Sequence, residues 1–418
     1  MAKKTVADLP KDSLRGKRVL VRLDLNVNID EKTGAITGDR RIRAALPTLQ
    51  YLIDTGASTI AMTHLGRPKP GADAAKNAPF RMNNVAKRLS EHLKQPVRKL
   101  DEVVGESVAK AVAQMKPGDV ILLENVRFHP FEQPKKEGSA EEIPKHEAGM
   151  KQLAADLARL GDVYVNDAFG TLQNKDVSVL ELPKAMKDKP RVIGFLVQKE
   201  LRKIDEIFAH NPEKLIGIMG GAKVSDKINF IKVLLGKVEK ILIGGAMTYT
   251  FMLAQGKKIG SSKAEKDKVD LARELLQLAG PKIILPEDHL VADRFDKSAN
   301  TKIAVGEIPD GWMGLDVGPK TIARYESEIR AAKTIIWNGP MGLYEWDEPF
   351  SHGTKAIALA MKAHGDTTIV GGGETADAVE KYNLADSMTH VSTGGGAFLK
   401  YVEDRKFKTL DQIEDAGK

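Results

Sequence analysis

The sequence is a chain of 418 residues, of which 42% are hydrophobic and 29% are charged, a balance typical of folded globular proteins and unlike that of disordered or fibrous chains. It contains no cysteine, which excludes disulfides and thiolate metal sites and agrees with a reducing compartment. The net charge of +7 favours anionic ligands, but lysines and glutamates interleave along helical stretches, so a solvated charged surface is favoured over a nucleic-acid site.

The amino terminus, MAKKTVADLP, lacks the apolar stretch of a secretory signal. The longest apolar segment, residues 241–254, is interrupted by glycines and is shorter than the roughly 20 residues that a membrane-spanning helix needs. We therefore expect a cytoplasmic protein with no membrane or nucleic-acid partner.

Along the chain, short runs rich in Val, Ile and Leu alternate with amphipathic stretches of helical period. Residues 41–57 carry an apolar stripe and end near Gly56, and residues 149–161 and 354–365 follow the same pattern. This alternation predicts an α/β protein in which parallel sheets are covered by helices.

Polar side chains end the predicted strands of the first half, where open α/β sheets bind their ligands. A lone arginine there more often forms a surface ion pair, and a lone histidine is more often packed or solvated. Several arginines with a histidine at successive strand ends favour a phosphate or carboxylate site, because the guanidinium group matches those anions. Arg41 opens the helix after the first strand, and the strand-end residues are Asp24, Asn26, His64, Arg67, Arg127 and Asp167.

The sequence also predicts a helix between the two halves and two loops within the first half. Residues 197–212 have helical period, which suits an ordinary packing helix as well as an interdomain connector. The Pro-, Lys- and Glu-rich stretches 68–79 and 132–147 are predicted to be exposed loops.

The strands of the second half end in glycine clusters instead. Any one cluster can serve only a tight turn, but four at equivalent positions favour backbone N–H groups that close on phosphate oxygens. Lys223 and Lys227 are spaced four apart, which predicts that they share one face at the start of a helix. The run LIGIMGGAKVSDK matches neither the common P-loop nor the dinucleotide fingerprint, so we expect a different nucleotide site.

The chain resembles phosphoglycerate kinases over essentially its whole length. The motifs that carry the resemblance include VRLDLNV, RRIRAALPT, HLGRP, LLENVRFH, VNDAFGT, GGAKVSDKI, WNGPMGLYE, GGGETA and HVSTGGGA, in family order. It implies two Rossmann-like lobes, each a mostly parallel sheet flanked by helices, joined by a connecting helix and hinge. The implied divisions are an N-terminal phosphoglycerate-binding domain over 1–196 and an interdomain helix over 197–212. A C-terminal nucleotide-binding domain follows over 213–395, and a tail over 396–418 returns to the first domain.

The resemblance also implies the roles of individual residues. Arg41, Lys223 and Lys227 would be catalytic. The residues that would bind 3-phosphoglycerate or 1,3-bisphosphoglycerate are Asp24, Asn26, Arg41, His64, Leu65, Gly66, Arg67 and Arg127. Those that would bind ADP or ATP are Gly221, Ala222, Lys223, Lys227, Gly245, Gly314, Asn338, Glu345, Gly371, Gly372, Gly373, Glu374 and Thr375.

The implied reaction is reversible phosphoryl transfer between the acyl phosphate and ADP in glycolysis and gluconeogenesis, with Mg²⁺ near Glu374 and the chain acting as a monomer. The acceptor carboxylate is already ionised at neutral pH, so the reaction needs alignment and charge neutralisation rather than a general base. Arg41 and Lys223 come from different lobes, which predicts domain closure before in-line transfer.

The chain departs from the family pattern at several positions. Gln173 and Asn174 stand where the family has His-Arg in its basic patch, which predicts weaker substrate binding, with Lys175 as a partial substitute. This departure also keeps an alternative open, a non-catalytic relative that binds nucleotide or regulates. Milder departures are the longer carboxylate of Glu374 and the single residues Asn28 and Glu287. The tail also lacks the usual Leu-Glu-Gly-Lys pattern.

Overall fold

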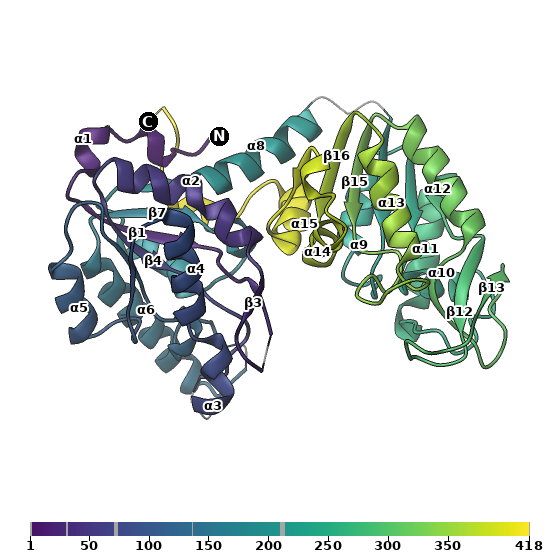
Figure 1. Ribbon diagram of the computed structural model, residues 1–418, viewed down its shortest axis with the longest axis horizontal. Helices are drawn as coiled ribbons and strands as arrows, with labels where there is room; N and C mark the ends of the chain where they lie inside the picture. Colours follow the sequence, from purple (N-terminus) through teal and green to yellow (C-terminus); the bar gives the residue numbers. More distant parts are fainter. Residues whose placement is uncertain (1, 31, 71–73, 136, 210–213, 418) are drawn as a thin grey trace. The chain divides into compact units, whose positions relative to one another are not determined.

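The chain forms two compact units, seen in a computed structural model (Figure 1). The first unit contains Met1–Arg202 and Lys406–Lys418, and the second contains Lys203–Arg405. The boundary between them falls inside helix α8, Phe195–Ala209, so one continuous helix contributes to both. The structure describes residues 2–30, 32–70, 74–135, 137–209 and 214–417.

The first unit is built on a parallel sheet whose strands lie in the order β5-β6-β4-β1-β7-β8. Because side chains alternate along a strand, β1 directs Val19, Val21 and Leu23 into one core and places Arg22 on the opposite face. A short antiparallel pair, β2 and β3, stands beside this sheet. The strand bounds are β1 Arg18–Leu23, β2 Asn28–Ile29, β3 Ile36–Gly38, β4 Ser58–Met62, β5 Val97–Lys99, β6 Val120–Leu122, β7 Val163–Asp167 and β8 Arg191–Ile193.

Helix α2, Arg40–Asp54, confirms the amphipathic stripe predicted near the amino terminus. Ile42, Leu49 and Leu52 are fully buried in the core over β1 and β4. The chain reverses after the helix at Gly56, whose φ of +71° lies in the left-handed region that favours glycine. The remaining helical segments are η1 Val6–Asp8, α1 Lys11–Leu14, α3 Ala74–Asn77, η2 Ala78–Phe80, α4 Asn83–Leu93, α5 Glu106–Ala113, η3 Val126–Phe128, α6 Glu142–Leu160, η4 Phe169–Thr171, the π-helix Val177–Glu181, α7 Leu182–Ala185 and η9 Leu410–Gln412.

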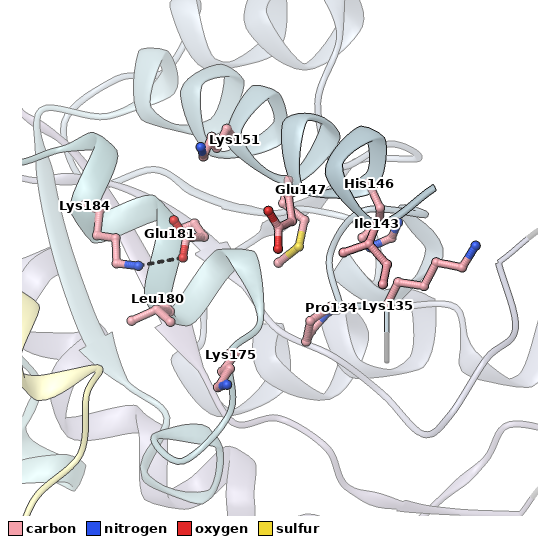
Figure 2. Close-up of a pocket in the computed structure, with 11 residues that line it drawn as sticks. Pro134, Lys135, Ile143, His146, Glu147, Lys151, Lys175, Leu180, Glu181 and Lys184 are labelled. Atoms are coloured by element: carbon pink, nitrogen blue, oxygen red, sulfur yellow. Dashed lines mark hydrogen bonds and ion pairs between the residues drawn. The ribbon is translucent and has the colours of Figure 1, made fainter. Parts of the chain in front are cut away.

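The prediction of a loop over 132–147 is wrong for its last part, because α6 begins at Glu142. The backbone N–H of Ser139 donates to the Glu142 carboxylate at 3.1 Å, and the N–H of Glu142 donates to the Ser139 hydroxyl at 3.2 Å. This reciprocal pair is of the capping-box type and starts the helix early. Figure 2 shows side chains of this first part of α6. Within the other predicted loop, 68–79, residues 74–77 form α3 and residues 71–73 lie outside the described residues.

The second unit contains a parallel sheet with the strand order β11-β10-β9-β15-β16-β17. This is the order of dinucleotide-binding sheets, in which the ligand crevice opens where the chain reverses direction across the sheet, here between β9 and β15. A smaller antiparallel sheet has the order β13-β12-β14. The bounds are β9 Leu215–Met219, β10 Lys240–Ile243, β11 Ile283–Ile284, β12 Asp288–Ala292, β13 Thr301–Val305, β14 Met313–Val317, β15 Thr334–Asn338, β16 Thr367–Gly371 and β17 His390–Val391.

Helices α12 and α13 cover one core of the second unit, where Tyr325, Ile357 and Met361 pack against Ile335 and Trp337 of β15. The predicted stripe in 354–365 is therefore confirmed, and so is the α/β fold class with a parallel sheet in each half. The helical segments are α9 Ile228–Leu235, α10 Met247–Ala254, η6 Lys266–Lys268, α11 Val269–Ala279, η7 Gly280–Lys282, α12 Pro319–Ala331, α13 His352–Lys362, α14 Gly373–Lys381, η8 Ala385–Ser387 and α15 Gly395–Asp404.

The two ends of the chain meet in the first unit (Figure 1). The N–H of Lys4 donates to the Glu414 carbonyl at 2.8 Å, and Lys3 forms an ion pair with Asp415 at 2.8 Å. Phe407 packs edge-on against Phe169 of the same unit, with 6.4 Å between the ring centroids. These contacts tie the carboxy-terminal segment to the amino-terminal unit.

The segment expected as a connector, 197–212, coincides with α8 up to Ala209, and residues 210–212 lie outside the described residues. Among the helices that the structure describes, none is both long enough and apolar enough to cross a membrane.

Candidate active site

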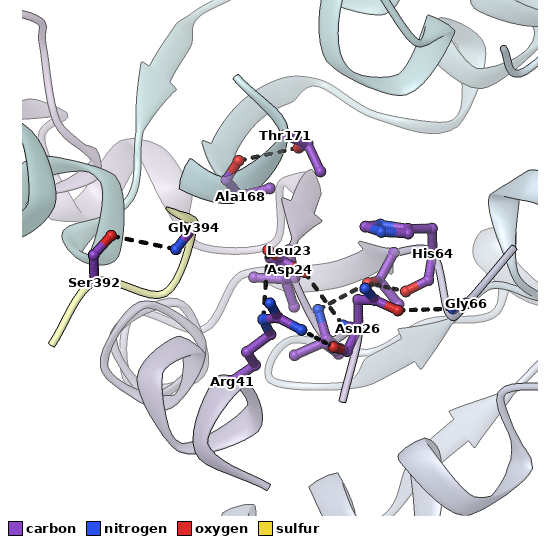
Figure 3. Close-up of polar contacts among 12 residues, drawn as sticks. Leu23, Asp24, Asn26, Arg41, His64, Gly66, Ala168, Thr171, Ser392 and Gly394 are labelled. Carbon is purple, nitrogen blue, oxygen red and sulfur yellow. Dashed lines mark hydrogen bonds and ion pairs between the residues drawn. The ribbon is translucent and has the colours of Figure 1, made fainter. Parts of the chain in front are cut away.

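Three loops of the first unit, after β1, β4 and β6, meet at Gly66. Figure 3 shows the contact between Asn26 and Gly66. The side-chain oxygen of Asn26 accepts the Gly66 N–H at 2.7 Å, and the guanidinium of Arg127 donates to the Gly66 carbonyl at 2.6 Å. Gly66 has a φ of +59°, and a Cβ at this position would overlap the ring of Phe80. Two of the strand-end residues predicted from the sequence, Asn26 and Arg127, are thus joined through one glycine that no other residue can replace without movement.

Arg41 reaches the same place from α2. Its Nε lies 3.9 Å from a carboxylate oxygen of Asp24, and its guanidinium donates to the carbonyl of Asn26. The side chain is partly exposed, whereas Asp24 is buried. Arg41 is thereby anchored on the loop after β1 while its charge stays close to the surface.

His64 is buried, and its Nδ1 lies 3.2 Å from the guanidinium of Arg22. Burial lowers the pKa of His64 well below its usual value, and the positive charges of Arg22 and nearby arginines lower it further. An arginine can only donate, so Nδ1 must accept, and the neutral ring keeps its proton on Nε2. His64 is therefore a neutral hydrogen-bond donor at physiological pH.

The two remaining arginines differ in burial. Arg127 is half-buried, and its Nε has no hydrogen-bond partner among the described residues. Burial lowers the pKa of Arg127, and the negative charge of Asp176 opposes that change. Arg67 is exposed. The side-chain amide of Asn125 donates to the carbonyl of Leu65 at 2.8 Å, which ties the loop that carries Arg67 to the loop that carries Arg127. The loops after β4 and β6 thus present one exposed and one half-buried guanidinium.

A buried polar network behind His64 was not predicted from the sequence. The hydroxyl of Ser178 accepts from Arg22 Nε at 2.8 Å and donates to Glu132 at 2.5 Å. Burial raises the pKa of Glu132 to about 8, and the charge of Asp176 contributes in the same direction. A single arginine inside the apolar run VLVRL was the available signal, since an unpaired charge there would be costly.

Asp167, also a predicted strand end, has a different place. It is fully buried, and one carboxylate oxygen accepts the N–H groups of Leu196 and Val197, at 2.9 and 3.2 Å, at the start of α8. Burial raises its pKa to about 7. Asp167 caps a helix and does not join the residues around Gly66.

The residues at the family's His-Arg positions contribute no cation. Gln173 is exposed, and the Asn174 amide donates to the Asp176 carboxylate at 3.1 Å. Lys175 lines a separate cavity, between α6 and α7. The structure thus gives Asn174 a carboxylate neighbour where the family pattern has an arginine.

In the second unit, the loop after β9 runs across the sheet at the reversal point. The N–H of Gly221 donates to the Pro340 carbonyl at 2.9 Å, and φ at Gly221 is +96°. The turn continues to Lys227, and α9 begins only at Ile228. The prediction that Lys223 and Lys227 share one face of a helix is therefore wrong: the glycine turn delays the helix, leaving Lys223 exposed while Lys227 turns inward.

Lys227 contacts the end of β15. Its ammonium donates to the Asn338 carbonyl at 2.9 Å and also to the Asn338 side-chain oxygen. Burial lowers the pKa of Lys227 to about 8, against the opposing charges of Glu374 and Asp226. The Asn338 side-chain nitrogen is buried without a hydrogen-bond partner among the described residues. This pair is suited to an incoming anion that would accept from both groups.

The next strand end opens a helix toward the same place. Gly372 has a φ of +106° and precedes α14, and Thr375 accepts the Gly339 N–H at 2.6 Å. The Cβ position of Gly373 is open space, and Glu374 in the first helical turn is exposed. Free N–H groups at a helix start attract phosphate. Gly371 ends β16, where a Cβ would press on the Phe398 ring.

A cavity of about 480 Å³ lies beside these glycines in the second unit. Tyr249 and Gly314 line it together, and the Tyr249 hydroxyl occupies the position that a Cβ of Gly314 would need. An apolar slot with a few polar groups at its edges suits a flat organic ring. The predicted residues that line it are Gly221, Ala222, Gly245, Gly314, Glu345 and Glu374, and those not predicted include Tyr249, Phe295, Met313 and Leu343.

Comparison with known proteins agrees with this arrangement. The family model for phosphoglycerate kinase matches residues 7–405. A phosphoglycerate kinase of Thermosynechococcus vestitus is 45% identical over 423 residues, covering 100% of both chains. One from Chloroflexus aurantiacus is 46% identical over 425 residues, again covering 100% of both.

Solved structures give the same result. A phosphoglycerate kinase from Coxiella burnetii has a TM-score of 0.76 with 34% sequence identity, and covers 98% of each chain. One from Pyrococcus horikoshii has a TM-score of 0.82 with 28% identity, covering 99% of this chain and 98% of that chain. With the family model and relatives extending over nearly the whole sequence, this chain belongs to the phosphoglycerate kinase family.

Proposed function

We propose that this protein catalyses reversible phosphoryl transfer between 1,3-bisphosphoglycerate and ADP, giving 3-phosphoglycerate and ATP. The observation that carries the proposal is the family match, which extends over residues 7–405 and is supported by full-length relatives at about 45% identity. The reaction belongs to glycolysis and, in reverse, to gluconeogenesis. The relatives give no reason to favour a non-catalytic module, the alternative that Gln173 and Asn174 kept open.

We assign the phosphoglycerate to the first unit. Arg41, Arg67 and Arg127 would bind its phosphate and carboxylate groups, since a guanidinium donates two parallel hydrogen bonds to such anions. His64, as a neutral donor, would bind an oxygen without adding charge, and Asn26 with Asp24 would orient the hydroxyl group. Leu65 and Gly66 would contribute backbone that these side chains hold in place.

We assign the nucleotide to the second unit. The cavity beside Gly314 and Gly245 would take the adenine and ribose, with Glu345 at its edge. Lys227 and Asn338 would meet the phosphates where β9 and β15 end. The loop and helix-start residues Gly221, Ala222, Gly371, Gly372, Gly373 and Thr375 would bind the phosphates through backbone N–H groups and a hydroxyl.

The chemical step would need alignment and neutralisation of charge. The acceptor in the ATP-consuming direction is a carboxylate, which is ionised at neutral pH, so no group of the chain has to remove a proton. Arg41 and Lys223 are the proposed catalytic cations, with Lys227 holding the nucleotide phosphates. Because Arg41 and Lys223 belong to different units, we propose that domain closure precedes in-line transfer.

Glu374 is the proposed protein ligand of Mg²⁺. Its carboxylate is exposed in the first turn of α14, and its charge opposes the lowering of the Lys227 pKa by burial. Magnesium typically binds one or two carboxylates together with substrate phosphates, so this donor fits the metal. When bound with the nucleotide, the metal would neutralise part of the phosphate charge.

A coupled assay with 3-phosphoglycerate and Mg-ATP tests the proposal. Wild-type protein should turn over, and Arg41→Ala should lower kcat/KM by a factor of about 100 or more, since one strong transition-state contact is worth roughly 3 kcal/mol. Arg43→Ala is the matched control, because Arg43 lies on the same helix but pairs with Asp39 at 2.9 Å on an exposed face. Equal losses in both variants, or no turnover by the wild type, would contradict the proposal.

Two further parts of the proposal concern the protein as a whole. We propose that it acts as a monomer, as the family resemblance implies, and that it is located in the cytoplasm, as expected from its sequence. Light scattering during size-exclusion chromatography, with and without substrates, and cell fractionation would test these two statements.

A further inference from the structure

A second cavity, of about 320 Å³, lies in the first unit, and none of the residues assigned to phosphoglycerate lines it. Figure 2 shows its lining residues. One wall is a single face of α6, on which Ile143, Glu147, Met150 and Lys151 recur at helical spacing. The opposite wall comes from the π-helix Val177–Glu181 and from α7. The volume is at the lower end of the range typical of small-molecule sites.

The floor of this cavity is apolar. Met150 and Leu180 are 7% and 8% exposed, and Ile143 and Pro134 complete the surface. Such a floor favours an apolar group over a fully hydrated ion, because an ion would lose water there without compensation.

The rim of the cavity is positive. Four lysines line it against two glutamates, Glu147 and Glu181. Lys184 is paired with Glu181 at 2.7 Å, and Lys135 is paired with Glu142 at 3.1 Å. The other two, Lys151 and Lys175, have neither an ion pair nor a hydrogen bond among the described residues, and Figure 2 shows them on opposite walls. Two unpaired ammonium groups therefore remain over an apolar floor, against the single unpaired carboxylate of Glu147 among the described lining residues.

We propose that this cavity is a second ligand site that takes a phosphate monoester with a small apolar body. The apolar body would rest on Ile143, Met150 and Leu180, and the phosphate would lie between Lys151 and Lys175. Lysine binds phosphate as a point charge from a flexible stem, whereas a planar carboxylate is better matched by arginine, and no arginine lines the cavity in the part of the chain that the structure describes.

The test uses phenyl phosphate as the probe and the full-length protein with labelled methionine methyl groups. Saturating 3-phosphoglycerate and ADP are present throughout, so that phosphate-binding residues elsewhere are occupied. The Met150 methyl signal, assigned with Met150→Leu, should shift as the probe is added, because this side chain lies in the cavity floor. The readout is local and does not depend on catalysis, so it stands apart from the proposed function.

The variants separate charge from shape. Lys151→Met with Lys175→Met should weaken binding of the probe at least tenfold, as expected for the loss of two charge-assisted contacts. Lys145→Met is the matched control, because Lys145 is exposed on the same helix but does not line the cavity, and it should bind like wild type. Inorganic phosphate and phenol, each with half of the probe's chemistry, should both bind more weakly than phenyl phosphate. An unshifted Met150 signal, equal binding by the double variant, or equal binding of inorganic phosphate would overturn the proposal.

Discussion

Restoring an arginine at position 174 tests how far the departure from the family pattern weakens substrate binding. A hydrogen bond to a charged group contributes about 1.5–3 kcal/mol, which corresponds to roughly 10- to 150-fold in affinity. The sequence alone would therefore predict a large gain from Asn174→Arg. The structure predicts a smaller gain, because the amide it replaces lies 3.1 Å from the buried Asp176 carboxylate.

Asp176 would compete with the substrate for the new guanidinium. An arginine–carboxylate pair at a partly buried position is similar in strength to an arginine–phosphate contact, so most of the gain is cancelled. We expect Asn174→Arg alone to tighten binding of 3-phosphoglycerate by only about threefold, or roughly 0.7 kcal/mol. In an Asp176→Asn background, where the competitor is neutral but similar in size, the same substitution should give about tenfold or more.

The measurement is a double-mutant cycle on the dissociation constant of 3-phosphoglycerate, determined by calorimetry without nucleotide, since KM need not equal Kd. Asp176→Asn alone is the reference for the double variant, because it also removes a negative charge that acts on Arg127. The reasoning is refuted if Asn174→Arg has the same effect in both backgrounds. Additive behaviour would mean that Asp176 does not hold the arginine.

Three other predictions rest on single contacts. The pKa of Lys227 is about 8 without ligand, and a bound phosphate should raise it, so ADP affinity should fall as pH rises above 8. Calorimetry should find that the ADP affinity of Lys227→Met depends less on pH. Equal slopes of affinity against pH in the two proteins would contradict this. Folded Asp167 keeps its proton up to about pH 7, whereas the unfolded chain loses it near pH 4, so the free energy of unfolding should fall with rising pH over that range. In urea titrations, the free energy of unfolding of Asp167→Asn should rise relative to wild type by about 2 kcal/mol between pH 5 and 7. Parallel pH profiles of the two proteins would refute this cause. Gly66→Ala should destabilise the first unit by about 1–3 kcal/mol and weaken 3-phosphoglycerate binding, because φ is +59° and Phe80 occupies the Cβ position; unchanged binding would remove Gly66 from the site.

Much of the first half-site was predictable because parallel strands end on the same side of a sheet. Asn26, Gly66 and Arg127 lie far apart in sequence, yet each follows a strand, and the structure joins them by hydrogen bonds. Asp167 satisfied the same rule and yet caps α8. The pattern identifies which residues stand at a sheet edge, but it does not specify which way each side chain turns.

The sequence did not predict the buried polar network behind His64. Arg22 and Glu132 lie 110 residues apart in the sequence. Their shared partner Ser178 belongs to a π-helix, which the pattern of apolar residues does not predict. The helical reading of Lys223 and Lys227 failed for a related reason, since spacing of four predicts a shared face only where the helix has already begun. Local turns at glycine decide that point.

The chain passes from one unit to the other twice, inside α8 near Arg202 and again after Arg405, before its end pairs with its beginning at Lys4 and Glu414. Two covalent crossings restrict the relative motion of the units more than one flexible linker would. A single protease cut at either crossing would leave the units tethered. Because the two ends adjoin, a circular permutant with new termini in an exposed loop should keep both crossings and fold into the same two units.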